Sequence, residues 1–545
     1  MKTEKPKKPE KDPVLFGVSF YEKNFSRERL ERDLTLIENG GFSVIRLCAS
    51  VWDDLDTGTE EYDFSQTDSI IKASDERDIY VILGLSALNE ELFRAVVSHN
   101  AGFENVIGFE LDCSPGGESL KWQKSIIEEY KRRDQFITGD LCSADEKNKA
   151  DTDAVSVAGT GIRFKGQDDY TGSEISFMGD LARSLKKGTY LVLDNSPETP
   201  GDWPPYPGQL LCMAFNHIAA GAGSIIFPFC SKGLSSNENC RIGLLGHDME
   251  ENETFREACG IGEALKNLTP DIGGLRKKNN IAIVMSTKTS GAPEHFSNAF
   301  GLSYNNALRW VYDALYEMNF ETDIIFDSDS FKGYKLLIFP GLYAADDSVI
   351  SKTDRFVKTG GVVFATFGSF FTDEAFNVRP DKQPHGLTKV FGMSYSQYAT
   401  PRDVYVDGSE SLFRMELINP STAETVSEYD HRYWGKYSAF TRNTYGMGRA
   451  YYLGTYVEPA RLKKYLMMAA QDAQIPKCAY EFPIIIKAGA NPAGELLLFI
   501  FNCSSTGRNI ILQWGGTELI SNNEFHAGQR IYIRDWGVMI LKVGR

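Results

Sequence analysis

Short hydrophobic runs alternate with longer amphipathic segments along the first half of the chain. Eight of these runs are six to eight residues long and rich in aliphatic and β-branched residues, which is typical of buried parallel strands. Between them lie segments with hydrophobic residues at helical spacing, such as residues 27–41, which end at Gly40-Gly41. The predicted strands cover residues 14–20, 43–50, 79–86, 105–112, 134–140, 153–159, 189–194 and 223–229.

This alternation, repeated eight times over residues 14–268, matches the usual size of a (β/α)8 barrel. A doubly wound open sheet is the alternative, although eight strands favour closure into a barrel. The segment after the fifth strand, LCSADEKNKAD, is short and polar for a helix. The other predicted helices include residues 27–41, 64–78, 119–133, 173–188, 208–223 and 253–268.

A joint rich in Pro, Gly and Lys at residues 269–278 precedes a second pattern of alternating strands and helices. This pattern predicts a flavodoxin-like open sheet, an architecture that glutamine amidotransferases also use. Such enzymes carry a thiol nucleophile on a tight turn between strand and helix. No cysteine lies between Cys259 and Cys478, so we expect this region to have a structural or assembly role.

Residues 477–545 contain strands separated by short turns and no predicted helix, which indicates a small all-β sandwich. The expected architecture is therefore an α/β barrel, an α/β second domain and an all-β third domain. The predicted limits are 1–13 for a disordered lead-in, 14–272 for the barrel, 273–476 for the second domain and 477–545 for the sandwich.

The seventh predicted strand leads directly into an acidic segment with two prolines, DNSPETPGDW. In a (β/α)8 barrel the chemistry lies at the C-terminal ends of the strands, so a catalytic carboxylate is expected at Asp194. The alternative is that Asp194 and Asn195 only form an Asx-type turn before Pro197.

Composition and charge exclude several classes of partner. The net charge of −16 argues against nucleic acid or an anionic membrane surface as a partner, because both favour basic proteins. No apolar run reaches the length of a membrane span, and the lysine-rich N-terminus lacks the apolar segment of a signal peptide. The nine scattered cysteines form no metal-type pair, so we expect a reducing cytoplasm and no cofactor or metal.

Three segments add a family resemblance. Residues 46–65, RLCASVWDDLDTGTEEYDFS, follow an Arg, Phe-Ala-Trp, Leu-Glu-Pro and Tyr-Asp-Phe pattern, and residues 106–112, VIGFELD, look like Ile-Gly-Trp-Gln-Ile-Asp. Residues 192–197, VLDNSP, resemble Val-Met-Glu-Gln-Ser-Pro. In this order the segments resemble glycoside hydrolase family 42, the bacterial β-galactosidase family. The resemblance implies a galactoside-like carbohydrate ligand and a homo-oligomer, a trimer formed through the second domain.

The same resemblance locates the chemistry and shows where this chain departs from it. A retaining glycosidase needs two carboxyl groups about 5–5.5 Å apart, one as acid/base and one as nucleophile. Asp194 occupies the nucleophile position, one methylene shorter than the family's glutamate, while Ser114 occupies the acid/base position. A serine hydroxyl does not donate a proton near neutral pH without a base partner, so we expect ordinary retaining activity to be impaired. The candidate replacement proton donors are Asp112, Glu118 and Glu198.

Of the positions that would contact sugar, some keep the family's residue type and others differ from it. The resemblance assigns Arg46 to the barrel mouth, with an ion pair inside the barrel as the alternative, and Trp203 to stacking on a sugar ring, with core packing as the alternative. Cys113 stands at the family's asparagine, Phe229 within its Arg-Trp-Arg segment, and Glu238 at a glutamate that binds sugar hydroxyls. The family's cysteine cluster for zinc is missing, so no metal is expected.

Two hypotheses of different classes remain. The first is a divergent glycoside hydrolase that acts on a β-galactoside or a related small glycoside, with Asp194 as nucleophile. The second is a catalytically inactive member that binds a sugar or serves as a scaffold, motivated by the joint change at Cys113 and Ser114. An unrelated lyase or hydrolase chemistry in the same barrel is a third alternative.

Overall fold

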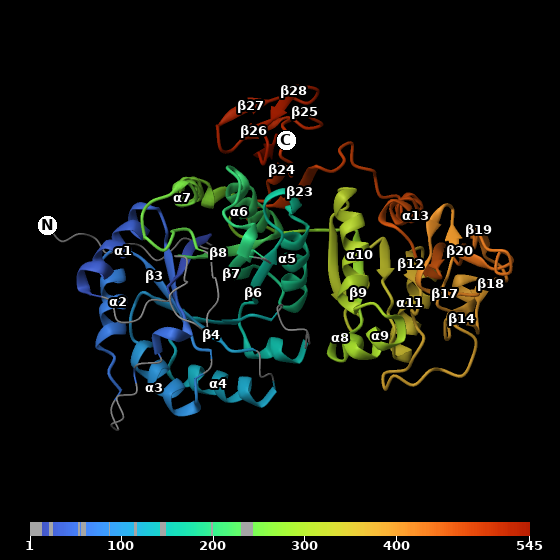
Figure 1. Cartoon of the computed structure of the whole chain (residues 1–545), viewed down its shortest axis with the longest axis horizontal. Helices are drawn as coiled ribbons and strands as arrows, with labels where there is room; N and C mark the ends of the chain where they lie inside the picture. Colours follow the sequence, from blue (N-terminus) through green and yellow to red (C-terminus); the bar gives the residue numbers. More distant parts are fainter. Residues whose placement is uncertain are drawn as a thin grey trace. The chain divides into compact units, whose positions relative to one another are not determined.

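The computed structural model describes residues 14–20, 26–52, 55, 62–86, 88–113, 117–141, 149–197, 200–229 and 243–544 (Figure 1). They form two compact units. The first unit contains the described residues up to Lys277 and again from Pro483 onward, and the second contains Lys278–Phe482.

The predicted (β/α)8 barrel is confirmed in the first unit. Within the described ranges, eight parallel strands follow the order β5-β4-β3-β2-β1-β8-β7-β6, and a parallel bridge between Asp140 and Gly159 joins β5 to β6 and closes the barrel. The strands are β1 (Leu15–Phe20), β2 (Val44–Leu47), β3 (Tyr80–Gly84), β4 (Val106–Leu111), β5 (Phe136–Gly139), β6 (Gly159–Phe164), β7 (Tyr190–Pro197) and β8 (Ala222–Pro228).

Helices follow most of these strands, and their starts agree with the polar residues that precede them. Ser26, Asn89 and Asn252 each accept a hydrogen bond from the backbone N–H three residues later, which caps α1, α3 and α7. After β5 the described residues form only a 3₁₀ turn, Lys149–Ala154. The helices are α1 (Arg27–Asn39), α2 (Ser65–Asp75), α3 (Glu90–Asn100), α4 (Gly117–Tyr130), α5 (Ser173–Leu185), α6 (Gln209–Ala220) and α7 (Glu253–Ile272).

The sixth strand lies later in the chain than predicted, at β6 (Gly159–Phe164) instead of residues 153–159. The hydrophobic pattern correctly reported burial, since Val155 and Ala158 are buried, but burial does not require strand pairing. The Ser156 hydroxyl hydrogen-bonds both the N–H and the C=O of Ile137 on β5. Side-chain bonding of this kind competes with a regular ladder, so the segment turns beside β5 instead of extending it.

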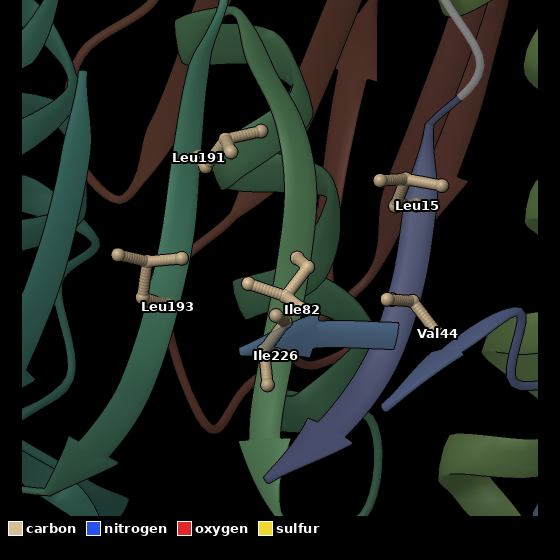
Figure 2. Packing of buried hydrophobic residues seen from close by; sticks show 6 residues of the cluster. All are labelled: Leu15, Val44, Ile82, Leu191, Leu193 and Ile226. Atoms are coloured by element: carbon tan, nitrogen blue, oxygen red, sulfur yellow. The ribbon is translucent and has the colours of Figure 1, made fainter. Parts of the chain in front are cut away.

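Aliphatic side chains from different strands pack together inside the barrel (Figure 2). Each is at most 8% exposed, and burying a side chain of this size contributes roughly 1.5–3 kcal/mol. The polar residues described below lie at the C-terminal end of the barrel. The cluster consists of Leu15, Val44, Ile82, Leu191, Leu193 and Ile226.

The C-terminal part of the chain is all-β, as predicted, and its antiparallel strands pack against helix α6 of the barrel. The Cys212 thiol on α6 lies in hydrogen-bonding contact with Cys503, and this contact, together with burial, raises the pKa of Cys212 well above its ordinary value. The strands are β23 (Ile484–Ala490), β24 (Leu496–Asn502), β25 (Arg508–Ile511), β26 (Gly516–Glu518), β27 (Asn523–Phe525), β28 (Arg530–Ile533) and β29 (Val538–Val543).

The second unit contains the predicted flavodoxin-like sheet. Its parallel strands have the order β10-β9-β11-β12-β21, which corresponds to the flavodoxin-like order 2-1-3-4-5. Two antiparallel strands of the described chain, β20 and β19, extend the sheet beyond β21. The main elements are β9 (Ile281–Met285), α10 (Tyr304–Glu317), β10 (Thr322–Phe326), β11 (Leu336–Phe339), α11 (Asp347–Lys358), β12 (Val362–Thr366), β19 (Glu424–Glu428), β20 (Ser438–Tyr445), β21 (Gly448–Leu453) and α13 (Pro459–Asp472).

The remaining elements of this unit are short. The helices are α8 (Thr287–Gly291), α9 (Pro293–Phe300) and α12 (Thr388–Phe391). The strands are β13 (Met393–Ser394), β14 (Tyr398–Ala399), β15 (Tyr405–Val406), β16 (Ser409–Glu410), β17 (Leu412–Glu416), β18 (Asn419–Pro420) and β22 (Thr455–Tyr456).

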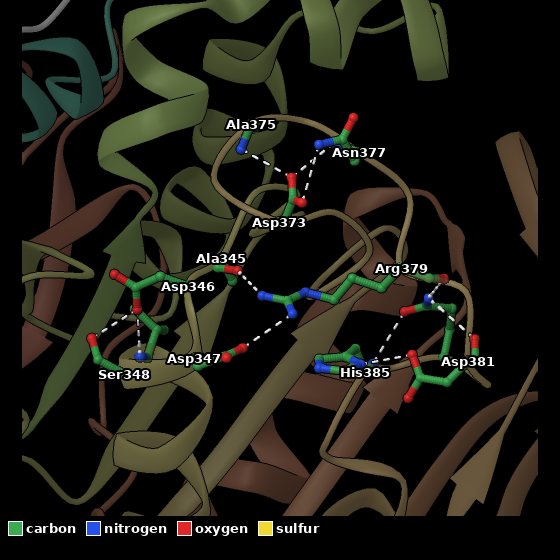
Figure 3. A network of polar contacts seen from close by, with 12 residues as sticks. Ala345, Asp346, Asp347, Ser348, Asp373, Ala375, Asn377, Arg379, Asp381 and His385 are labelled. Atoms are coloured by element: carbon green, nitrogen blue, oxygen red, sulfur yellow. Dashed lines mark hydrogen bonds and ion pairs between the residues drawn. The ribbon is translucent and has the colours of Figure 1, made fainter.

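Polar side chains hold the loops around the start of α11 (Figure 3). Arg379 donates to the carbonyl of Ala345 at 2.9 Å and forms an ion pair with Asp347 at 3.0 Å. Asp373 accepts two backbone N–H bonds in the neighbouring loop, and a ring nitrogen of His385 lies 2.6 Å from Asp381.

In the described parts of the chain, no helix is both long and apolar enough to cross a membrane.

Candidate active site at the C-terminal end of the barrel

Strand β7 continues through Asp194 and Asn195 to Pro197, so these residues do not form the turn considered as an alternative. Its pairing with β6 contains a bulge: Thr160 pairs with Val192, but Gly161 pairs with Asp194, which leaves Leu193 without an opposite residue. A bulge reverses the alternation of faces along a strand. Leu193, which lies in the interior cluster, and Asp194 therefore point to the same side of the sheet, the inside of the barrel.

The neighbours of Asp194 agree with this inward direction. The Ser196 hydroxyl donates to Asp194 Oδ1 at 2.6 Å, and Arg163 Nη2 on β6 lies 3.9 Å from Asp194 Oδ2. Asn195 faces the opposite way and hydrogen-bonds His217 Nε2 on α6 at 3.3 Å. The Asp194 side chain is 15% exposed, so its carboxylate is accessible to solvent. Ser196 and Arg163 hold it in place.

A second carboxylate, Asp140, lies across Gly161 from Asp194. If Gly161 carried a Cβ, that atom would lie 2.8 Å from Asp140 Oδ2 and 3.9 Å from the Cβ of Asp194. Asp140 is the last residue of the fifth predicted strand and was not predicted as a site residue. The signal was available, because Asp140 ends the fifth predicted strand just as Asp194 ends the seventh.

Asp112 and Cys113 follow β4 at the same end of the barrel. The backbone N–H of Asp112 donates to Gln123 Oε1 at 3.2 Å, which connects this loop to α4. The sulfur of Cys113 lies over Gly139, only 2.4 Å from where a Cβ at that position would be. Ser114, the predicted acid/base position, lies outside the described residues.

Arg46 is engaged inside the barrel. Its Nε donates to Glu110 Oε2 at 2.5 Å and its Nη2 donates to Glu110 Oε1 at 2.7 Å, while Nη1 donates to Ser19 at 3.3 Å. Both partners are largely buried, with side chains 12% and 6% exposed. The ion pair weighed as the alternative for Arg46 is therefore present, and a direct contact between Arg46 and substrate stays a prediction.

The two aromatic residues that were predicted to contact sugar are buried. Trp203 is 8% exposed, and Phe229 is 1% exposed and stacks on Phe20 with ring centroids 6.3 Å apart. Their roles as sugar contacts stay predictions. Glu238, the predicted partner of sugar hydroxyls, lies outside the described residues, as do Glu198 and the side chain of Glu118.

Behind β7, His217 on α6 is completely buried, and burial lowers the pKa of His217 to about 3. Its ring is therefore neutral at physiological pH and supports Asn195 through a hydrogen bond. Among the residues that the structure describes, no group of three or more His, Cys, Asp or Glu side chains is arranged to hold a metal ion.

Two family models match the chain. The model of the β-galactosidase trimerisation domain matches residues 279–476, and the β-galactosidase model of glycoside hydrolase family 42 matches residues 118–268. The β-galactosidase LacZ of Lactobacillus acidophilus is 26% identical over 387 residues, which cover 67% of this chain and 57% of that protein. The chain thus spans little more than half of that relative's length. The β-galactosidase BgaA of Clostridium cellulovorans is 21% identical over 97% of this chain and 100% of its own length.

Solved structures show the same fold. The β-galactosidase from Bacillus circulans sp. alkalophilus superimposes with a TM-score of 0.85 at 16% identity, covering 98% of this chain and 99% of that one. The cold-adapted β-galactosidase from Rahnella sp. R3 superimposes with a TM-score of 0.86 at 17% identity, covering 97% and 98%. At these identities the likeness shows the shared architecture of all three parts of the chain.

Proposed function

The chain belongs to glycoside hydrolase family 42, and on that premise we propose that it hydrolyses a β-galactoside or a related small glycoside with Asp194 as the nucleophile. The observation that carries the proposal is the bulge in β7, which directs the Asp194 carboxylate into the C-terminal end of the barrel. Chemistry in this fold occurs at that end. The Arg163 guanidinium at 3.9 Å and the Ser196 hydroxyl orient the carboxylate.

In this proposal Asp194 attacks the anomeric carbon, the leaving-group oxygen takes a proton, and water later hydrolyses the glycosyl ester. Two departures from the family reduce ordinary retaining activity. Asp194 is one methylene shorter than the family's glutamate, and a retreat of about 1 Å from the reacting carbon costs on the order of 10²-fold in rate. Ser114 replaces the acid/base glutamate, so protonation of a poor leaving group is slower.

Aryl galactosides test the proposal directly. The wild-type chain should release 2,4-dinitrophenol from its β-galactoside, whereas Asp194→Ala should not. A 2-deoxy-2-fluoro-galactosyl fluoride should label the wild-type chain covalently on the peptide that contains Asp194. Turnover that is equal in the wild type and in Asp194→Ala would exclude Asp194 as nucleophile.

A second candidate function is binding without hydrolysis, as a sugar-binding or scaffold member of the family. Its specific support is the combined substitution at Cys113 and Ser114. Calorimetric titration with galactose and lactose distinguishes the two candidates. A sugar that binds and is recovered intact favours the second, and turnover of that same sugar favours the first.

We also propose that the chain assembles as a homotrimer through the second unit, because the trimerisation-domain model of the family matches residues 279–476. Light scattering after size-exclusion chromatography measures the mass directly. A 60.9 kDa chain should give about three times that mass as a trimer. A mass close to that of one chain would contradict the proposal.

A further inference from the structure

We propose that Asp140 is the proton donor that replaces the missing glutamate in this active site. The inference rests on the proposed glycoside hydrolysis with Asp194 as nucleophile, and it names the residue that completes the pair of carboxyl groups. The support comes from the arrangement of β5, β6 and β7 at the C-terminal end of the barrel.

Distances across Gly161 set an upper limit on the separation of the two carboxyl groups. The position of a Cβ on Gly161 lies 3.8 Å from Asp140 Cγ and 3.9 Å from Asp194 Cβ. Adding these distances to one C–C bond of about 1.5 Å gives an upper limit of about 9 Å between the two carboxyl carbons. Pairs of carboxyl groups in glycosidases are about 5–5.5 Å apart for retention and about 6.5–9.5 Å apart for inversion.

The strand order also favours Asp140 over Asp112. In the barrel sheet β5 is separated from β7 only by β6, whereas Asp112 follows β4, one strand further away. Side chains in one layer of a (β/α)8 barrel come from alternate strands, and β5 and β7 are such a pair. The strand between them contributes Gly161, which has no side chain to separate the two carboxyl groups.

Gly161 therefore has a specific role in this arrangement. A Cβ at 2.8 Å from Asp140 Oδ2 is closer than non-bonded atoms pack, so any other residue would displace the Asp140 carboxyl group. The backbone does not otherwise require glycine here, because Gly161 is absent from the positive-φ positions of the described chain. The close approach of the Asp140 carboxyl group gives a physical reason for glycine at this position.

Asp140 and Asp194 divide the chemical step between them, one as proton donor and the other as nucleophile. Asp140 gives its proton to the glycosidic oxygen while the bond from that oxygen to the anomeric carbon breaks and Asp194 forms the glycosyl ester. The aglycone leaves as a neutral alcohol, and Asp140 becomes a carboxylate. It then takes a proton from the water that attacks the ester, which frees the sugar and regenerates both residues.

Leaving-group dependence tests this role. A 2,4-dinitrophenolate needs no proton to depart, but an alkyl or phenyl leaving group does. Asp140→Asn should lower kcat/KM for phenyl β-galactoside by about 10²–10⁴-fold and that for the dinitrophenyl galactoside by less than 10-fold. Added azide should accelerate the variant and yield galactosyl azide, because azide attacks the ester without a general base.

Asp134→Asn is the matched control. It makes the same chemical change at the opposite end of β5, where Asp134 pairs with Arg132 at 3.3 Å. It should keep wild-type kcat/KM for both substrates. Gly161→Ala is a second probe that leaves both carboxylates in the chain, and it should reproduce the leaving-group dependence of Asp140→Asn because it displaces the Asp140 carboxyl group.

The outcomes separate the two proposals. If the wild type turns over the dinitrophenyl galactoside but Asp140→Asn behaves like the wild type, or loses both substrates equally while folded, Asp140 is not the proton donor. A leaving-group-dependent loss in Asp112→Asn instead would assign the role to Asp112. If the wild type shows no turnover above Asp194→Ala, the proposed function and this inference both fail. Should Asp140→Asn not fold, Gly161→Ala decides by the same criterion.

Discussion

Arg46 on β2 and Glu110 on β4 meet inside the barrel through two hydrogen bonds, from Nε to Oε2 at 2.5 Å and from Nη2 to Oε1 at 2.7 Å. The strand between them contributes Gly84, where a Cβ would lie 3.2 Å from Glu110 Oε2. The same arrangement recurs around Asp140, Gly161 and Asp194. In both places, polar side chains from alternate strands approach each other across a glycine.

Removing one partner of this buried ion pair should be costly. Arg46→Met or Glu110→Leu alone leaves a buried charge without its partner and should lower the free energy of unfolding by about 3–5 kcal/mol. The double variant should lose much less than the sum, because no charge remains buried. Urea unfolding of the four proteins gives the coupling energy. Additive losses would contradict the prediction.

The buried histidine behind β7 should make stability depend on pH. Because burial lowers the pKa of His217 to about 3, only the unfolded chain takes up this proton as the pH falls below the ordinary value of 6.5. Stability should therefore fall between pH 6.5 and pH 3. His217→Gln removes the titrating group and keeps an N–H donor for Asn195. Between pH 7 and pH 4 it should lose roughly 3 kcal/mol less than the wild type. Equal losses in urea unfolding would exclude this role.

The second unit contains a buried ion pair that should make the stability of the protein depend on pH in the opposite direction. Arg414 pairs with Glu416 at 3.0 Å and stacks on the ring of Tyr398 at 3.6 Å, with both charged side chains at most 4% exposed. Burial raises the pKa of Glu416 above its ordinary value of 4.5, and Arg414 opposes this rise. The folded state thus holds a proton to higher pH than the unfolded chain, and stability falls as the pH rises through that window.

Arg414→Met removes the opposing charge and should raise the pKa of Glu416 further. We expect a loss of about 3–5 kcal/mol at pH 8 and a clearly smaller loss at pH 5, where Glu416 can be neutral. Arg442→Met serves as a control, because Arg442 pairs with Asp472 in a setting where its side chain is 30% exposed. That variant should lose about 1 kcal/mol or less. Thermal unfolding at both pH values separates these outcomes.

Restoring the family's acid/base residue should restore activity where Asp140 has been removed. Ser114→Glu in the Asp140→Asn background should raise kcat/KM for phenyl β-galactoside by about 10–10²-fold, since it supplies a proton donor at the position that the family uses. The double variant with Ser114→Gln has the same length and no acid, and it should show no gain. Equal rates for the two double variants would contradict the prediction.

The barrel was predictable because its strands are buried on both faces and read as continuous hydrophobic runs. The sixth strand was the exception, since Gly159–Phe164 contains two glycines and an arginine, while Ala154, Val155 and Ala158 are buried outside the ladder. In the second unit the sequence predicted the parallel strands but not β13–β18, most of which are only two residues long. Pieces so short have no detectable period.

The active-site predictions show a similar division. Asp194 was found by its place at the end of a hydrophobic run, but its inward direction depends on a bulge opposite Gly161 that no pattern of residue types reveals. Asp140 ends the fifth predicted strand but was missed, because the approach of its carboxyl group to Asp194 depends on the lack of a side chain at Gly161, which the pattern of residue types does not reveal. An ion pair inside the barrel was the alternative expected for Arg46, because a charged residue in a barrel strand needs a partner, but the sequence did not identify Glu110 as that partner.

The two parts of the first unit are separated in the chain by the whole of the second unit. Roughly 205 residues, Lys278–Phe482, must be synthesised between the barrel and the C-terminal strands that pack against α6. At about 5–20 residues per second, the ribosome needs roughly 10–40 s to add them. Throughout that interval the nascent barrel carries an apolar α6 without its C-terminal sheet. The burial of α6 is therefore completed only after the C-terminal strands have been synthesised.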